Sequence, residues 1–306
     1  MLALEVRSLN KRFGAVQAVN DISFMVDKGE FFGLLGPNGA GKTTIIRMIT
    51  GVIDPDGGSV LVEGADLKES FFEAKSKMGV IPEVGNVYPD LSARENIDLV
   101  GRFYGLPKSL RDERSERLLA DMGLKERADD LTRKFSKGMR QRVSIACAMV
   151  HEPPILILDE PTEGLDVMSR RLIVDKVKEM NRKGSTVILT THNIEEANRL
   201  CQRVCIINQG SVVAIDSPEN LRKTAEKMQI VEVGFDRKAD PGWFVSEAIT
   251  RAELCGDKWR FYAEDPDKAI EQIMRVKERE GLKILSITTA GPTLEDVFVK
   301  LCEVRP

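Results

Sequence analysis

The sequence predicts an α/β fold for its first 217 residues and a smaller α+β domain after them. Short apolar runs alternate with amphipathic segments, which is typical of a sheet covered by helices on both faces. A glycine-rich loop, GPNGAGKTT at residues 36–44, stands between one apolar run and the start of a helix. Beyond Ser217 and Pro218 the pattern weakens, so we place the domains at 1–217 and 218–306.

Strands and helices are expected in a regular order along the first domain. We expect strands at 4–6, 22–26, 31–35, 59–63, 78–81, 155–158, 186–190 and 204–208, and helices at 44–50, 167–182 and 194–200. Residues 85–150 are expected to be mostly helical, with a capping box formed by Ser92 and Glu95. In the helix expected at 110–123, the charge run RDERSER is interpreted as a solvated face.

The second domain carries no catalytic signature of its own. We expect strands at 230–235, 260–262 and 282–288 and a helix at 266–279. The last helix is expected to begin at Thr293, which would cap it together with Asp296.

Composition excludes several classes of protein. Hydrophobic residues make up 42% and charged residues 30% of 306, so a normal globular core is expected. A net charge of −3 argues against a nucleic-acid-binding surface spread over the whole chain. The five cysteines form no CxxC pair, so we expect free thiols in a reducing cytoplasm. No signal peptide or apolar run of spanning length is visible.

The loop at 36–44 matches the P-loop pattern G-x-x-x-x-G-K-[ST]. We expect Gly36, Gly39 and Gly41 to adopt positive φ, so that successive N–H groups point into one concavity at a helix start. Lys42 would reach the β- and γ-phosphates, and the Thr43 hydroxyl would ligate Mg²⁺. The expected phosphate-binding residues are Gly36, Pro37, Asn38, Gly39, Ala40, Gly41, Lys42, Thr43 and Thr44.

Two carboxylates follow the apolar run at 155–158. Asp159 and Glu160 would lie at the carboxyl end of a parallel strand, where such sheets bind ligands. Adjacent carboxylates there are costly without a cation, so we expect Asp159 to hold Mg²⁺ and Glu160 to act as general base. The alternative is an exposed acidic turn.

The stretch FSKGMRQR at 135–142 resembles the signature of the ATP-binding cassette (ABC) family, LSGGQ followed by x-Q-R. Ser136, Gly138, Gln141 and Arg142 match, whereas Phe135, Lys137 and Met139 differ. The resemblance implies that Ser136, Lys137, Gly138 and Met139 contact the ATP of a partner cassette. Without the family, this stretch is only a capped basic helix.

Further positions follow from the same resemblance, which covers residues 1–217. His192 matches the switch histidine that contacts the γ-phosphate, and Asp166 lies in the loop that lines the partner subunit. Phe13 stands where an aromatic stacks on adenine, although a core position is the alternative. Glu83 replaces the usual glutamine and would ligate Mg²⁺.

The resemblance implies a P-loop NTPase fold, with a RecA-like core sheet, an antiparallel β subdomain and a helical subdomain at about 85–150. It implies an ATP-hydrolysing subunit that uses ATP and Mg²⁺, pairs with a second copy or a related cassette, and drives a separate permease. Binding to nucleic acid is not implied. Its place would be peripheral, on the cytoplasmic face of the cell membrane. Glu83 and GPTLEDVFVKL at 291–301 are similar to exporters of antibiotics, lipids, polysaccharides and sodium.

A soluble ABC ATPase in translation or DNA repair is the alternative. Translation-type proteins usually carry two cassettes, and repair-type proteins insert a long coiled coil. This chain has one cassette and only 94 residues between Lys42 and Lys137. A regulatory nucleotide sensor would lack the general base, whereas Glu160 is present.

Overall fold

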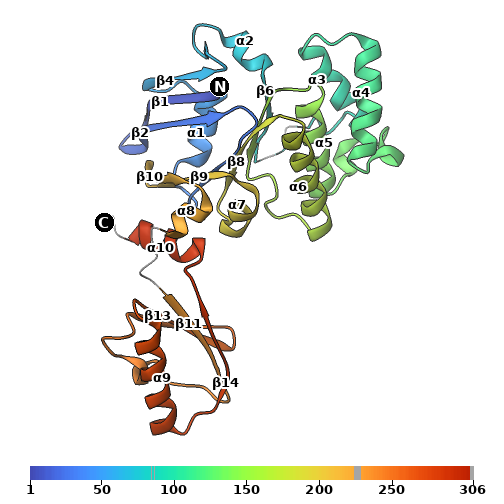
Figure 1. Cartoon of the computed structure of the whole chain (residues 1–306). Coiled ribbons are helices and arrows are strands. Elements are labelled where there is room, and N and C mark those ends of the chain that lie inside the picture. The colour runs from blue at the N-terminus through green and yellow to red at the C-terminus, as the bar shows by residue number, and fades with distance from the viewer. Residues whose placement is uncertain (84, 86, 224–228, 304–306) are drawn as a thin grey trace. The chain divides into compact units, whose positions relative to one another are not determined.

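A six-stranded sheet forms the centre of the first of two units in the computed structural model (Figure 1). The structure describes residues 1–83, 85, 87–223 and 229–303. The two units are Met1–Asp216 and Ser217–Pro306. Across the sheet, the strands are β10 (Ser211–Asp216), β9 (Arg203–Asn208), β3 (Phe31–Leu35), β8 (Thr186–Thr191), β7 (Ile155–Asp159) and β6 (Met78–Ile81). All neighbours are parallel except β10 and β9, which confirms the predicted α/β fold.

Strand β10 was not predicted. It returns from the turn at Gln209 and Gly210 and pairs antiparallel with β9 at the sheet edge. All six of its residues are half-buried, so they show no sharp alternation between apolar and polar positions.

An antiparallel sheet lies in the same unit, as the fold class predicted. Its order is β2 (Val16–Asp27), β1 (Leu2–Phe13), β4 (Gly57–Val62) and β5 (Ala65–Asp66). The first two strands are much longer than expected, because each runs for 12 residues. Their register shifts between Val6 and Leu9, and this irregularity interrupts the alternation that would have revealed the full strand.

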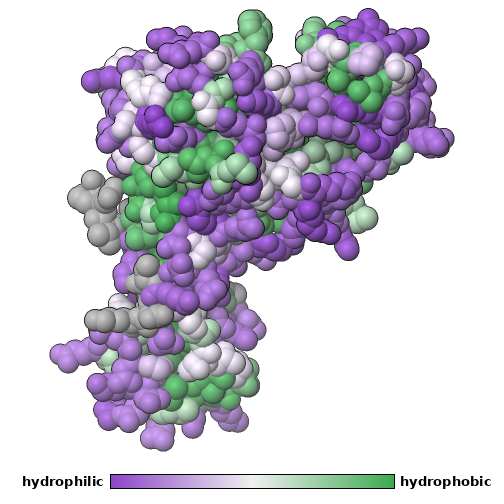
Figure 2. All heavy atoms as spheres, turned by 45° about the horizontal axis from the view of Figure 1, so that its top comes forward, coloured by the Kyte–Doolittle hydropathy of each residue, from purple (hydrophilic) through white to green (hydrophobic). Residues whose placement is uncertain are grey.

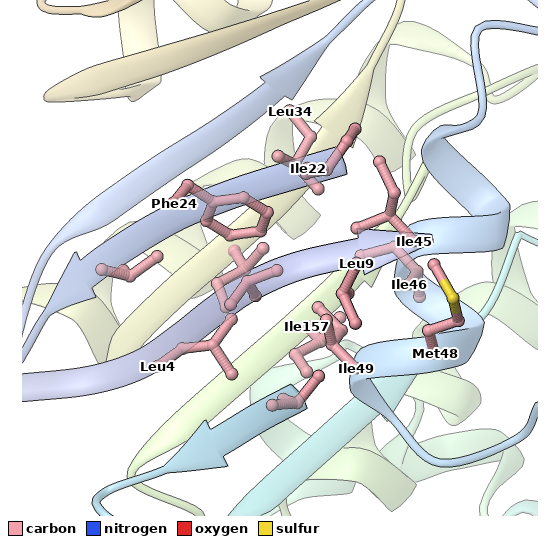
Figure 3. Close-up of a cluster of buried hydrophobic side chains, with 14 of the residues drawn as sticks. Leu4, Leu9, Ile22, Phe24, Leu34, Ile45, Ile46, Met48, Ile49 and Ile157 are labelled. Atoms are coloured by element: carbon pink, nitrogen blue, oxygen red, sulfur yellow. The ribbon is translucent and has the colours of Figure 1, made fainter. Parts of the chain in front are cut away.

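The first helix, α1 (Lys42–Ile49), begins directly after the glycine-rich loop. Its apolar side chains lie among residues of both sheets, and Figure 3 shows Ile45 and Ile49 close to Leu9 of β1 and Ile157 of β7. All four of these side chains are fully buried. Burial between two sheets therefore fixes the start of α1, and with it the loop.

Among the remaining helices of the unit, α2 was not predicted, whereas the others fall in the regions expected to be helical. They are α2 (Phe71–Ser76), α3 (Ala93–Phe103), α4 (Lys108–Asp121), α5 (Lys137–Met149), α6 (Val167–Arg182) and α7 (Ile194–Leu200), with short 3₁₀ turns at Lys125–Arg127 and Thr132–Lys134. The capping box of α3 is confirmed. Ser92 Oγ accepts from Glu95 N at 3.1 Å, and Glu95 Oε2 accepts from Ser92 N at 2.7 Å.

The charge run on α4 is not simply a solvated face. The Arg111 side chain is only 13% exposed and donates to Asp98 Oδ1 at 2.6 Å. The Arg114 side chain is 14% exposed and donates to the Val150 carbonyl at 2.8 Å. These contacts join α4 to α3 and to the end of α5, so the interpretation was wrong for both arginines.

The second unit has its own sheet and core. Its elements are α8 (Pro218–Lys223), β11 (Gln229–Phe235), a 3₁₀ turn at Pro241–Phe244, β12 (Arg251–Cys255), β13 (Lys258–Ala263), α9 (Pro266–Glu280), β14 (Ile284–Ala290) and α10 (Leu294–Glu303). The antiparallel order is β12-β13-β11-β14. Strand β12 was missed because RAELC lacks an apolar run. The cap of α10 is confirmed, since Thr293 N donates to Asp296 Oδ2 at 2.8 Å.

The face drawn in Figure 2 is mostly hydrophilic, with small apolar areas. Among the described residues we find no helix whose length and apolarity would let it cross a membrane. Cys147, Cys201, Cys205 and Cys255 are free thiols, and only Cys255 of these four is exposed.

Candidate functional site

The glycine-rich loop turns sharply between β3 and α1. Gly39 and Gly41 adopt φ of +81° and +103°, as predicted. Gly36 does not adopt positive φ, so that expectation was wrong. Glycine is needed at Gly36 for space instead, because a Cβ there would lie 2.4 Å from the Ile207 carbonyl oxygen. A Cβ on Gly41 would lie 2.5 Å from the Ala18 carbonyl oxygen.

A cavity of about 550 Å³ opens over this loop and the start of α1. Eight predicted residues line it: Asn38, Gly39, Gly41, Lys42, Thr43, Thr44, Glu83 and Glu160. Six others were not predicted: Val16, Gln17, Ala18, Glu163, Gln209 and Gly210. The unpredicted residues come mostly from the β1–β2 hairpin and the β9–β10 turn, which only the folded chain brings beside the loop.

Lys42 lies at the floor of this cavity. Its ammonium donates to the carbonyls of Gly36 at 2.8 Å and Pro37 at 3.2 Å, so the lysine also closes the loop around itself. Lys42 Nζ is 3.3 Å from Glu160 Oε1, and the two side chains are only 6% and 9% exposed. Glu160 Oε1 accepts no hydrogen bond in the part of the chain described, so this contact is purely ionic.

The carboxylate of Glu160 has a second partner. Its Oε2 lies 3.1 Å from His192 Nδ1, and the His192 side chain is 43% exposed. The structure thus brings Lys42, Glu160 and His192 together, although they lie in three distant parts of the sequence. These two contacts fix the position of the Glu160 carboxylate in the cavity wall, and a fixed position is the first requirement of a general base.

Oxygen ligands lie beside this group. The Thr43 hydroxyl is 3.5 Å from Asp159 Oδ1, and Asp159 is 3% exposed. Hydroxyl and carboxylate oxygens fit Mg²⁺. No cluster of three or more His, Cys, Asp or Glu suited to a metal occurs among the described residues. The Thr43 hydroxyl and the Asp159 carboxylate are two oxygen donors, and Mg²⁺ usually keeps several waters and phosphate oxygens beside one or two protein ligands. Glu83 lines the cavity, whereas its neighbours Val84 and Asn86 lie outside the described residues.

The predicted signature residues lie elsewhere in the chain. Ser136 caps α5, since its Oγ accepts from Met139 N at 3.2 Å. Gly138 packs so closely against α6 that a Cβ would lie 2.6 Å from Ser169 Oγ. Asp166 caps α6 by accepting from Ser169 N at 2.8 Å, and this bond lowers the pKa of Asp166. None of these residues, nor Lys137, lines the cavity over the loop.

A second cavity of about 380 Å³ contains Lys137. Glu83 and Glu163, which also line the first cavity, share it with Lys137 and Arg140. Lys137 Nζ lies over Gly164, 2.7 Å from the position of an added Cβ. The lysine therefore shares this cavity with two carboxylates and one other cationic side chain.

Phe13 is at the end of β1 and is 51% exposed, which rules out the alternative of a core position. It does not line the cavity, which the same hairpin reaches through Val16, Gln17 and Ala18. Lys11 Nζ lies 5.7 Å from the centre of the Phe13 ring.

Comparisons with known proteins agree with this geometry. Residues 19–163 match the family described as "ABC transporter". A relative from Ralstonia nicotianae, named "Nod factor export ATP-binding protein I", is 36% identical over 298 residues, 97% of this chain and 93% of the relative.

Two solved structures resemble the fold. "Structure of ATP binding subunit of ABC transporter" has 34% identity and a TM-score of 0.68, covering 72% of this chain and 92% of the other. A dimeric ATP-binding cassette in a post-hydrolysis state, bound to ADP and Pi, has 26% identity and a TM-score of 0.65, covering 70% and 98%.

Proposed function

This chain belongs to the ABC transporter family as an ATP-hydrolysing subunit of the exporter type, and we propose that Glu160 is its general base. The contact that carries the proposal is the Glu160 carboxylate between Lys42 Nζ at 3.3 Å and His192 Nδ1 at 3.1 Å. The relatives reported above are named for export or for ATP binding in transporters, so the translation or repair alternative has no support.

The loop residues bind the triphosphate in this proposal. N–H groups of residues 39–44 and the Lys42 ammonium bind the β- and γ-phosphates. Thr43, Asp159 and Glu83 would hold Mg²⁺, which offsets phosphate charge when bound. The attacking water gives its proton to Glu160 as its oxygen bonds to the γ-phosphorus, and the bond from that phosphorus to the bridging oxygen breaks to release ADP. His192 orients the Glu160 carboxylate and contacts the γ-phosphate.

A second cassette completes each site. Ser136, Lys137, Gly138 and Met139 do not line the loop cavity of their own chain, which supports a role for them in a partner's site. The dimeric form of a similar cassette points the same way. We propose a pair of identical or related cassettes in which Asp166 lines the shared surface and Phe13 approaches the adenine.

A separate permease would carry the cargo. The described residues contain no helix fit to span a membrane, so we propose that this subunit is peripheral, on the cytoplasmic face, and docks on a membrane partner. The segment around Glu83 to Glu95 would transmit the motion, since Glu83 lines the cavity and Glu95 lies in the first turn of α3. We propose that the permease selects the cargo.

Replacing Glu160 tests the base. We expect Glu160→Gln to lower the rate of phosphate release by about 10²–10⁴-fold, the usual contribution of a general base, with ATP binding retained. Steady-state phosphate release and binding of a fluorescent nucleotide measure the two effects. Glu195→Gln, an exposed carboxylate on α7, is the matched control and should keep the parent rate. Near-normal hydrolysis by Glu160→Gln would remove Glu160 from this role.

A further inference from the structure

Thr190 is a fully buried threonine at the carboxyl end of β8, opposite Asp159 in the register of β7. Its hydroxyl donates to Asp159 Oδ1 at 2.5 Å. The Thr190 hydroxyl oxygen also accepts a hydrogen bond from the N–H of Glu160 at 3.0 Å. One hydroxyl therefore contacts both a proposed Mg²⁺ ligand and the backbone of the proposed base.

The backbone of Glu160 needs such a restraint. Its φ is +45°, in the left-handed region that side chains with a Cβ disfavour. Glu160 N donates to the Thr190 carbonyl oxygen at 3.2 Å as well as to the hydroxyl. Both bonds come from one residue of β8 and hold the turn in which the carboxylate leaves the end of β7.

The chain just after β8 also contacts the carboxylate of Glu160, through His192. His192 follows Thr190 by two positions and lies directly after the end of β8. His192 Nδ1 lies 3.1 Å from Glu160 Oε2. Thr190, near the end of β8, thus contacts the backbone of Glu160, and His192, just after β8, contacts its carboxylate.

The neighbouring Thr191 has a different set of contacts. Its hydroxyl donates to Glu196 Oε2 at 2.9 Å, and Glu196 Oε1 accepts from Thr162 Oγ1 at 2.9 Å. This chain of bonds holds the segment after Glu160 against α7. It does not replace the Thr190 hydroxyl, because it contacts neither Asp159 nor the N–H of Glu160.

We propose that Thr190 is a positioning residue for hydrolysis: its hydroxyl, itself held by Asp159 Oδ1, fixes the backbone of Glu160. This inference rests on the proposed role of Glu160. Apart from His192, the groups of this chain proposed to bind the phosphates lie on the P-loop and α1, so loss of the hydroxyl should slow the chemical step and leave nucleotide binding intact. If Thr190 only filled space, its replacement would not slow the chemical step selectively while leaving nucleotide binding intact.

Three variants test the proposal. Thr190→Val keeps the shape and removes the hydroxyl; we expect kcat to fall by about 10- to 100-fold, since small misplacements of catalytic groups have effects of this size. KM for ATP should change by less than about threefold, because it reflects binding. Thr190→Ser, which keeps the hydroxyl, should recover kcat to within about threefold of the parent. If Thr190→Val does not fold, Thr190→Ala gives the same test without a branched side chain.

Thr186→Val is the matched control. Thr186 is a buried threonine at the other end of β8, and its hydroxyl accepts from Gly29 N at 2.9 Å. We expect kcat of this variant to stay within about twofold of the parent, even if its thermal midpoint falls.

A double-mutant cycle shows whether Thr190 acts through Glu160. In Glu160→Gln, adding Thr190→Val should change single-turnover phosphate release by less than about twofold, because the residue it positions is already disabled. The proposal would be overturned if Thr190→Val lowered phosphate release by the same factor in Glu160→Gln as in the parent. It would also be overturned if Thr190→Val left kcat unchanged, or if Thr190→Ser did not recover kcat. If Glu160→Gln itself retains activity, the proposed base fails first and the cycle shows which inference is at fault.

Discussion

His151 is a half-buried imidazole stacked on Tyr104. Their ring centroids are 3.5 Å apart and the rings are nearly parallel, at 5°. His151 Nε2 lies 3.1 Å from the Met78 carbonyl oxygen, and Nδ1 has no hydrogen-bond partner in the described chain. Burial lowers the pKa of His151 to about 4, with Arg114 nearby adding to the effect.

This histidine should make folding stability depend on pH. Below the ordinary pKa of about 6.5 the unfolded chain takes up a proton that the folded chain does not, so stability falls as pH drops from 6.5 and levels off near 4. By pH 5.5 the loss should be about 1.4 kcal/mol. Urea unfolding at pH 7.5 and 5.5 measures it. His151→Phe, which cannot titrate, should lose this part of the difference; an unchanged difference would contradict the assignment.

Some residues of the site could be predicted from the sequence alone, and others could not. Lys42, Asp159 and Glu160 were predicted because fixed spacing and an apolar strand mark them, and the structure brings them together. Thr190 carries no such mark. Its role depends on the register that places it opposite Asp159, and register cannot be read from either strand alone.

At the scale of elements, the start of α3 matters most for the proposed coupling. Ser92 is 5% exposed and forms a reciprocal cap with Glu95. This cap fixes where α3 begins.

Removing that cap should cost stability. We expect Ser92→Ala to lower the free energy of unfolding by about 1 kcal/mol, the usual loss at an N-cap. Denaturant unfolding followed by circular dichroism measures it. Ser70→Ala is the control, because Ser70 precedes α2 without any side-chain cap bond, and it should lose less than about 0.5 kcal/mol. Equal losses in the two variants would argue against the cap as the cause.

Elements were predictable where local chemistry marked them. Strands β3 and β6 and helices α6 and α7 have the expected bounds, because apolar runs or caps limit them. Strand β10 was missed since all its residues are half-buried, and β12 because its sequence has no apolar run. These two edge strands form because they pair with β9 and β13. Such pairing is a property of the folded sheet and cannot be read from the local sequence.

At the scale of the whole molecule, the shared site predicts that two inactive chains restore each other. Each shared site consists of the P-loop of one chain and residues 136–139 of the other. Lys42→Ala disables the P-loop half of a site, and Ser136→Ala disables the half that the partner contributes. In a mixed pair, one site keeps both intact halves, so equal mixing should give up to about one quarter of the parent rate if the sites act independently. Phosphate release from each chain alone and from the mixture measures this. A mixture no faster than the sum of its components would count against shared sites.

The free thiols have a practical consequence. Burial raises the pKa of Cys147 and Cys205 to about 12, and it raises that of Cys201 as well, so these three should resist maleimide dyes in the native protein. Cys255 on β12 is exposed, although burial and nearby Glu253 raise its pKa somewhat. Of these four thiols, only Cys255 is open to a fluorophore. A dye there would mark the smaller unit and leave the cassette chemically unchanged, which allows energy-transfer measurements during turnover.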